Sequence, residues 1–179
     1  MIPSVIDYLL QLPEAMHFAK VNELCSDGIS SYRMLSDYGS GTFQVIELEN
    51  NLLLILIGDY KPKDTFEKIT EISEDYLEIS QFETDSSSFK IGGRKRNQVD
   101  KGIYCYLNTQ KKTYTYCEGG KAVRFTKVIL SPQYFQTYFK LHNENTDILL
   151  NAARDYLLKN PNLPELNFAV SYTHLRAHE

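Results

Sequence analysis

The sequence predicts an α+β domain in which a short helix comes first, a block of strands follows, and two helices come last. Two observations predict this order. Between residues 20 and 130, short alternating or apolar runs recur between turn signals, which is typical of a closed or sandwiched β structure. After residue 131, apolar residues recur at spacings of three and four, the period of an amphipathic helix.

The N-terminal helix is expected over residues 4–12, because Ser4 suits an N-cap and Pro13 follows the last apolar position. Six strand segments are expected in the block that follows: residues 42–48, 52–60, 75–84, 102–109, 112–117 and 122–130. Gly119 and Gly120 separate the last two segments and supply the positive φ that a tight turn needs. We therefore expect those two segments to pair as a hairpin.

The C-terminal part predicts two helices. Ser131 and Pro132 are typical of the first two positions of a helix, which is expected over residues 131–142. A second helix, over residues 146–159, carries an apolar stripe that is broader than one packing contact requires. Four residues of this stripe are expected to hold two copies of the chain together: Ile148, Leu149, Ala152 and Tyr156. In the alternative, the stripe docks on the sheet of its own chain.

The composition indicates a globular domain of the cytoplasm. The 19 Lys and Arg residues against 23 Asp and Glu residues give a net charge of −4, so this chain alone is not expected to bind nucleic acid. Three cysteines are an odd number and too few for a disulfide scaffold. The longest apolar run, residues 52–57, is far shorter than the roughly 20 residues of a membrane helix, so no membrane contact is expected.

The last ten residues, 170–179, do not continue the preceding pattern, and they resemble the translated read-through of a sequencing adapter. We set them apart as a non-native tail and expect the native chain to continue beyond Ala169. The sequence then divides into an N-terminal helix or arm (1–19), a strand domain (20–130), a helix pair (131–169) and the tail.

Four tyrosines are the candidate ligand-binding residues: Tyr104, Tyr106, Tyr114 and Tyr116. They recur at period two on two consecutive strand segments, so we expect them to share the faces of one hairpin. Tyrosine rings can line an apolar pocket and offer hydroxyl groups to a polar ligand such as a sugar. The alternative is that these rings pack across neighbouring strands on one sheet face.

The order of these segments resembles the N-terminal sensing region of AraC-family bacterial transcription regulators, over residues 20–169. The resemblance rests on residues 51–59, 76–82, 102–106, 119–120 and 128–135. It implies a cupin-like jelly roll that binds a small-molecule effector, followed by two helices that form a homodimer. It also implies that DNA is bound only by a C-terminal helix-turn-helix domain that this chain lacks.

Neither a metal site nor a catalytic site is expected. Barrels of the cupin kind usually hold a metal with a His-x-His pair, a glutamate and a later histidine, and residues 20–130 contain no histidine. No cofactor is expected either. The alternative function is a stand-alone, metal-free cupin-like sugar-binding protein or isomerase. An isomerase would need an acid/base pair drawn from Glu47, Glu78 and Glu83, for which the spacing shows no histidine or lysine partner.

Overall fold

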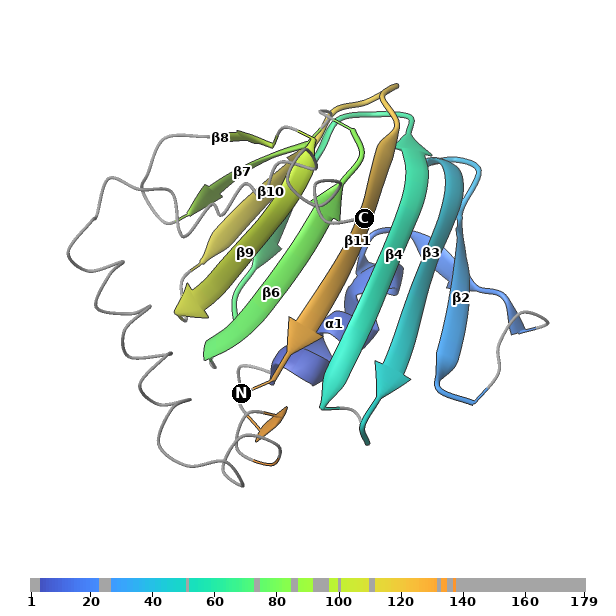
Figure 1. The fold of residues 1–179 in the computed structure, drawn as a ribbon. Helices are drawn as coiled ribbons and strands as arrows, with labels where there is room; N and C mark the ends of the chain where they lie inside the picture. Colours follow the sequence, from blue (N-terminus) through green and yellow to red (C-terminus); the bar gives the residue numbers. More distant parts are fainter. Residues whose placement is uncertain are drawn as a thin grey trace, which may run out of the picture.

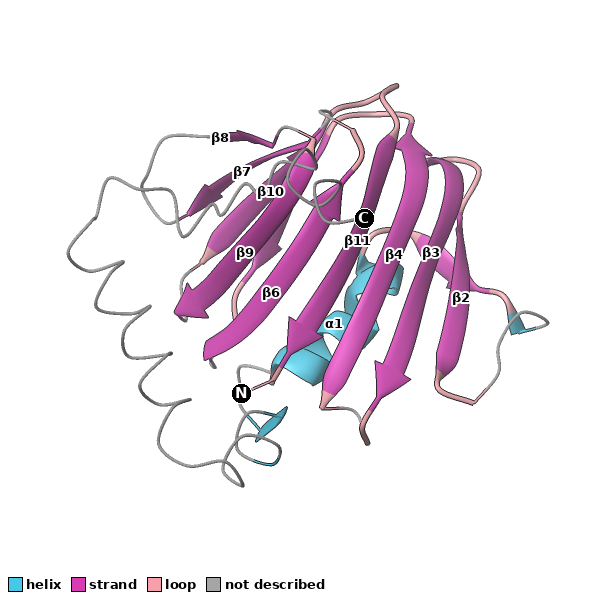
Figure 2. Cartoon of the chain, viewed as in Figure 1, coloured by secondary structure: helices cyan, strands magenta, loops and turns pink. Residues whose placement is uncertain are grey.

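The structure is a computed structural model that describes residues 4–22, 27–50, 52–72, 75–84, 87–91, 97–99, 101–109 and 112–131, together with residues 133, 134 and 137. The described part of the chain is mostly antiparallel β structure with one longer helix (Figures 1 and 2). The expected strand block between residues 20 and 130 is confirmed.

The helix α1 (Val5–Ala15) begins where the sequence predicts, because the Ser4 side chain accepts a hydrogen bond from the backbone N–H of Asp7 at 3.2 Å. Its end is predicted three residues too early. Pro13 lies inside the last turn, where a proline removes a single backbone hydrogen bond, and the backbone N–H of Met16 then donates to the carbonyls of Leu12 and Pro13.

The strands form two antiparallel sheets. The larger sheet holds seven strands, in the order β1 (Phe18–Lys20), β2 (Ile29–Met34), β3 (Gly39–Leu48), β4 (Leu53–Pro62), β11 (Val123–Leu130), β6 (Asp75–Phe82) and β9 (Gly102–Thr109). The smaller sheet holds four strands, in the order β5 (Phe66–Thr70), β10 (Thr113–Cys117), β7 (Ser87–Ile91) and β8 (Asn97–Val99). All six predicted segments are strands, and β1, β2, β5, β7 and β8 were not individually predicted.

The hairpin predicted at Gly119–Gly120 is wrong, because β10 pairs with β5 and β7 whereas β11 pairs with β4 and β6. The tight turn itself is present: Gly120 has a φ of 75°, and its N–H donates to the Pro62 carbonyl at 2.7 Å. A glycine turn reverses the chain but does not decide whether the two strands pair. After this turn the chain passes to the seven-stranded sheet. There β11 lies between β4 and β6 and turns its buried side chains toward the core on one face.

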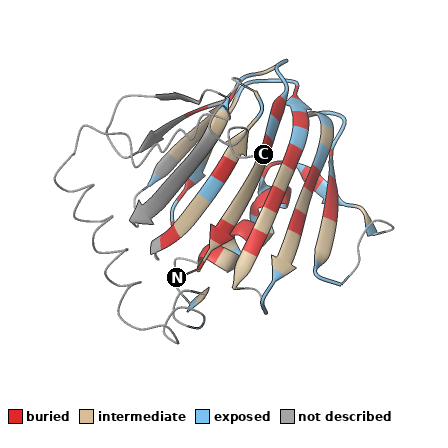
Figure 3. Cartoon of the chain, viewed as in Figure 1, coloured by how far each residue is buried: buried red, intermediate tan, exposed pale blue. Residues whose placement is uncertain are grey.

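The core lies on one face of the seven-stranded sheet, called here the inner face. Its fully or nearly fully buried residues include Phe43, Val45, Leu54, Leu56, Tyr60, Val123 and Ile129. Figure 3 shows the alternation of burial along β4 that produces this face. The helix α1 adds Val5, Leu9 and Leu12 to the same core. The four-stranded sheet faces this core, since the Cys117 sulfur of β10 lies 3.6 Å from the Tyr60 hydroxyl of β4.

After β11, Ser131 is fully buried and caps the next residues as predicted, because its Oγ accepts a hydrogen bond from the backbone N–H of Tyr134 at 3.2 Å. Most of the two predicted helices, 131–142 and 146–159, lies outside the described residues. The tail 170–179 and the four residues of the predicted dimer surface also lie there: Ile148, Leu149, Ala152 and Tyr156.

Candidate functional site: a charged cluster between the two sheets

Three ionisable side chains face the space between the sheets and influence one another electrostatically. Lys127 of β11 donates a hydrogen bond from Nζ to Glu78 Oε1 of β6 at 2.6 Å. Ser80 donates to the same carboxylate oxygen at 2.5 Å. The side chains of Lys127 and Glu78 are 24% and 15% exposed, so the pair is largely but not wholly withdrawn from water. With Lys68 of β5, described below, these residues form what we call the interior cluster.

The strand register explains why these side chains point inward. Along β11, Lys127 lies an even number of residues from buried Val123, Phe125 and Ile129, so it shares their face. Directly across, Lys127 pairs with Ser80, and the next inward residue, Ile129, pairs with Glu78. Glu78 is therefore the diagonal neighbour of Lys127, within the reach of a long side chain.

Lys68 approaches the cluster from the smaller sheet. It shares one face of β5 with Phe66 and buried Thr70, while Glu67 and Ile69 on the other face are exposed. Its Nζ lies 5.3 Å from the centre of the Tyr8 ring of α1. Within the described part of the chain, Lys68 forms no ion pair and its ammonium group has no hydrogen-bond acceptor.

Burial and charge set the protonation of the cluster. Burial first, and the positive charge of Lys127 second, lower the pKa of Lys68 to about 7, although Glu78 and Cys117 partly oppose this shift. Burial alone would raise the pKa of Glu78, but the Lys127 charge and the hydrogen bonds from Lys127 and Ser80 outweigh it and hold that pKa below its usual range. At neutral pH, Glu78 is therefore ionised, while Lys68 is divided between its two protonation states.

Aromatic rings surround the cluster. The Lys127 Nζ lies 5.4 Å from the centres of both the Phe82 and Phe125 rings. The Tyr8 hydroxyl donates to the Ile69 carbonyl at 3.0 Å and lies 3.2 Å from Thr70 Oγ1. These contacts join α1 to β5 beside Lys68. A movement of Lys68 would therefore directly affect its contact with Tyr8 of the N-terminal helix.

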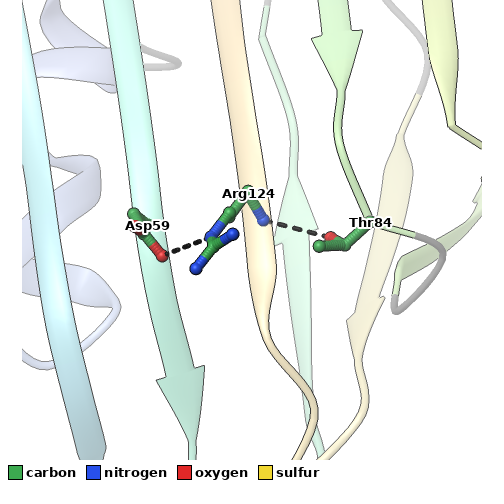
Figure 4. Close-up of polar contacts among 3 residues, drawn as sticks. All are labelled: Asp59, Thr84 and Arg124. Carbon is green, nitrogen blue, oxygen red and sulfur yellow. Dashed lines mark hydrogen bonds and ion pairs between the residues drawn. The ribbon is translucent and has the colours of Figure 1, made fainter.

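An ion pair on the opposite face of β11 provides a contrast (Figure 4). Arg124 Nε lies 3.1 Å from Asp59 Oδ1, and the Arg124 backbone N–H donates to Thr84 Oγ1 at 3.1 Å. The Arg124 and Asp59 side chains are 54% and 60% exposed, so water screens this pair and its contribution to stability is small. The same strand thus carries a screened pair outside and a desolvated pair inside.

The four predicted tyrosines do not share a hairpin, because β9 and β10 belong to different sheets. In the backbone register of β9, Tyr104 pairs with Ser80 and Tyr106 pairs with Glu78. On β10, Tyr114 and Tyr116 alternate with Cys117, whose side chain points toward the inner face, and they pair with exposed Ile69 and Glu67 of β5. Tyr114 and Tyr116 therefore occupy the outward positions of β10. Ligand binding by these tyrosines stays a prediction.

Of the three candidate carboxylates, Glu78 has the basic partner that sequence spacing did not reveal. Glu47 lies in the same row of the sheet, opposite Leu54, but three strands away from Glu78, a separation of about 14 Å at the usual strand spacing. Glu83 is exposed just beyond β6. The missed signal was a lysine on the inward face of β11, which is otherwise apolar. Lys127 is 49 residues from Glu78, so the strand pairing brings them together.

Within the described residues, no three or more His, Cys, Asp or Glu side chains come together in a group that could hold a metal ion. None of the helices in that part of the chain has the length and apolar character needed to cross a membrane.

No family model matches the chain, and no curated protein matches it. Its neighbours among solved structures are cupin-fold domains. The cupin domain of Cnp3 from Schizosaccharomyces pombe is 8% identical with a TM-score of 0.41, and the match covers 51% of this chain and 61% of that one. Ectoine synthase from P. lautus is 11% identical with a TM-score of 0.38, covering 73% and 78% of the two chains.

HutD from Pseudomonas fluorescens is 12% identical with a TM-score of 0.37, covering 66% of this chain and 59% of HutD. This chain therefore spans less than two thirds of both the Cnp3 domain and HutD. At these identities and TM-scores, the likeness carries no argument about function.

Proposed function

We propose that this chain is the effector-sensing part of a regulator of the AraC type, and that a small molecule binds between its two sheets. The observation that carries the sensing role is the interior cluster. A charged group is costly to withdraw from water without a partner, and the partly buried Lys68 has no acceptor among the described residues. A bound effector would supply that acceptor. The regulator class is supported by the sequence resemblance over residues 20–169.

The contacts around Lys68 suggest how binding reaches the rest of the molecule. An effector on Lys68 would touch β5, and β5 is joined to α1 by the hydrogen bonds of Tyr8. A ligand that binds one arrangement of α1 and β5 more tightly than another shifts the protein toward that arrangement. In the proposal, this shift changes how the helix pair 131–169 of a homodimer presents a DNA-binding domain that lies outside this chain.

The interior cluster also favours one second candidate, a metal-free isomerase. Glu78 is ionised at neutral pH, and the pKa of Lys68 is about 7, the value that suits proton transfer at that pH. The two candidates differ in what happens to the ligand. A sensor returns its ligand unchanged, whereas an isomerase converts it.

A thermal-shift screen of the full chain against neutral sugars, sugar acids and small hydroxy acids tests the sensing role. We expect at least one compound to raise the melting temperature, because a ligand that binds only the folded state stabilises it. NMR spectra of that compound after prolonged incubation should be unchanged. Conversion of the compound would support the isomerase, and the absence of any shift across the screen would contradict both candidates.

Dimerisation is tested separately by light scattering. The full chain should be a dimer, and Ile148→Asp should make it a monomer because a charge enters the predicted apolar stripe. Asn151→Asp adds the same charge outside the stripe and should leave the dimer intact. A wild-type monomer, or a dimer that Ile148→Asp leaves unchanged, would show that this surface does not hold two copies together.

A further inference from the structure

The charges that face Lys68 are unbalanced. Lys127 approaches it from β11, Glu78 from β6, Cys117 from β10 and the Tyr8 ring from α1. Glu78 is the one carboxylate in this set, and its Oε1 already accepts from both Lys127 and Ser80. With Lys68 protonated, the cluster holds two positive charges and one negative charge. A ligand with one negative charge would balance it.

The hydrogen-bonding groups of Lys68 and Glu78 that have no partner among the described residues also indicate the kind of ligand. The Lys68 ammonium has three donors and, among the described residues, no acceptor. Within the same residues, Glu78 Oε2 has no hydrogen-bond donor, since both bonds to this carboxylate go to Oε1. The cluster therefore lacks an anionic acceptor at Lys68 and a neutral donor at Glu78. A carboxylate and a hydroxyl group on one small molecule would supply both.

Building on the proposed sensing function, we infer that the effector is a small hydroxylated carboxylate, such as a sugar acid. Its carboxylate binds Lys68, one of its hydroxyl groups donates to Glu78 Oε2, and its carbon skeleton lies near the rings of Tyr8, Phe82 and Phe125. A neutral sugar can offer a hydroxyl oxygen to Lys68 but no negative charge to balance the cluster, and a free metal cation meets two ammonium groups.

Binding of the carboxylate is expected to be accompanied by partial protonation of Lys68. In the free protein at pH 7, burial and Lys127 leave Lys68 only partly protonated. A carboxylate beside it favours the ammonium form, so it raises the pKa of Lys68 and draws in a fraction of a proton as it binds. Tyr8 does not contribute to this proton uptake, because burial raises its pKa and its hydroxyl group stays protonated near neutral pH.

Matched ligands test the inference by calorimetry on the full chain. The probes are D-galacturonate against D-galactose, D-gluconate against D-glucitol, and L-lactate against 1,2-propanediol. We expect at least one acid to bind at least tenfold more tightly than its neutral counterpart, with uptake of up to about half a proton at pH 7 in paired buffers. Inorganic phosphate serves as a second anion and should bind more weakly than that acid.

Variants locate the binding site. Lys68→Met should weaken binding of the acid by at least tenfold and abolish proton uptake, while Lys68→Arg should retain binding because it keeps the charge. Lys61→Met removes an equal charge from an exposed position of β4 and should change neither quantity.

Three outcomes would overturn the inference: no acid binds, an acid binds but Lys68→Met has no effect, or a neutral partner or phosphate binds as tightly as the acid. Each leaves the sensing function to be judged by the thermal-shift screen. A neutral compound that stabilises the protein there would preserve sensing while excluding this ligand class.

Discussion

The desolvated ion pair between Glu78 and Lys127 makes a quantitative prediction for stability. Lys127→Met keeps most of the side-chain length and its contact with the Phe82 and Phe125 rings, but it leaves the ionised Glu78 with Ser80 as its remaining donor among the residues that the structure describes. The two side chains are 24% and 15% exposed, so water compensates only in part. A hydrogen bond to a charged group under these conditions contributes about 1.5–3 kcal/mol.

Relief of the repulsion between Lys127 and Lys68 offsets part of that loss, so we expect Lys127→Met to lower the free energy of unfolding by about 2 kcal/mol. Glu78→Met should lower it by a similar amount, because two ammonium groups then face each other with no carboxylate beside them in the described part of the interior. The double variant Glu78→Met/Lys127→Met should be near wild type, since apolar side chains often replace a buried pair without loss.

Urea unfolding of the full chain at pH 7 measures these values. With a slope of about 2 kcal/mol per molar urea, a loss of 2 kcal/mol moves the midpoint by about 1 M. The double-mutant cycle built from Glu78→Met, Lys127→Met and the double variant should give a coupling energy of about 4 kcal/mol between Glu78 and Lys127, because each single variant loses about 2 kcal/mol and the double variant loses little.

The control is the exposed pair on the other face of β11, Arg124 and Asp59, whose coupling should stay below about 1 kcal/mol. If the interior pair couples no more strongly than this exposed pair, the two side chains are not desolvated together.

Three further predictions, two on the scaffold and one on the pH dependence of stability, are measured by the same unfolding assay. Gly41 has a φ of 121°, and an added Cβ would lie 2.3 Å from the Asp59 carbonyl, so Gly41→Ala should cost more than about 3 kcal/mol. Gly120→Ala meets no atom within 4 Å and should cost only about 1–2 kcal/mol, through its φ of 75°; equal costs would contradict the close approach of β3 and β4. Ser4→Ala should cost about 1 kcal/mol by removing the cap of α1, and no loss would mean that the cap does not hold in solution. Because the pKa of Lys68 is about 7 in the folded state against 10.5 in the unfolded state, the unfolded chain binds the extra proton between these values. Stability should therefore rise with pH across that window, by up to about 1.4 kcal/mol per unit from this group, and Lys68→Met should remove that rise; identical pH profiles would refute it.

The sequence predicted the strand block well, because burial on one face of a sheet produces the period of two that is visible in the segments that became β3 and β6, while the segment that became β4 stands out as a continuous apolar run. It also identified the caps at Ser4 and Ser131, since N-capping is a local interaction. The predicted hairpin at Gly119–Gly120 failed for the converse reason. A turn is local, but the choice of partner strand depends on the whole sheet, and β11 pairs with β4 and β6.

The candidate site was harder to predict than the fold. Glu78 was singled out as a carboxylate, but its partner Lys127 is 49 residues away and is brought beside it by the pairing of β6 with β11. Lys68 comes from the other sheet, so no spacing rule connects it to either residue. The tyrosines were chosen on the assumption of one shared hairpin, and the crossing of the chain between sheets separates Tyr104 and Tyr106 from Tyr114 and Tyr116.

The titration of Lys68 tests the interior cluster most directly. Lysines labelled with 13C at Cε report the protonation of each amine by NMR, and the Lys68→Met variant assigns the signal. In the free protein, the structure predicts a titration midpoint near pH 7, with the midpoint moving upward when a carboxylate ligand binds. A midpoint near the ordinary lysine value of about 10.4 would mean that Lys68 lies in water, away from Lys127 and Glu78, and the account of the interior would be contradicted.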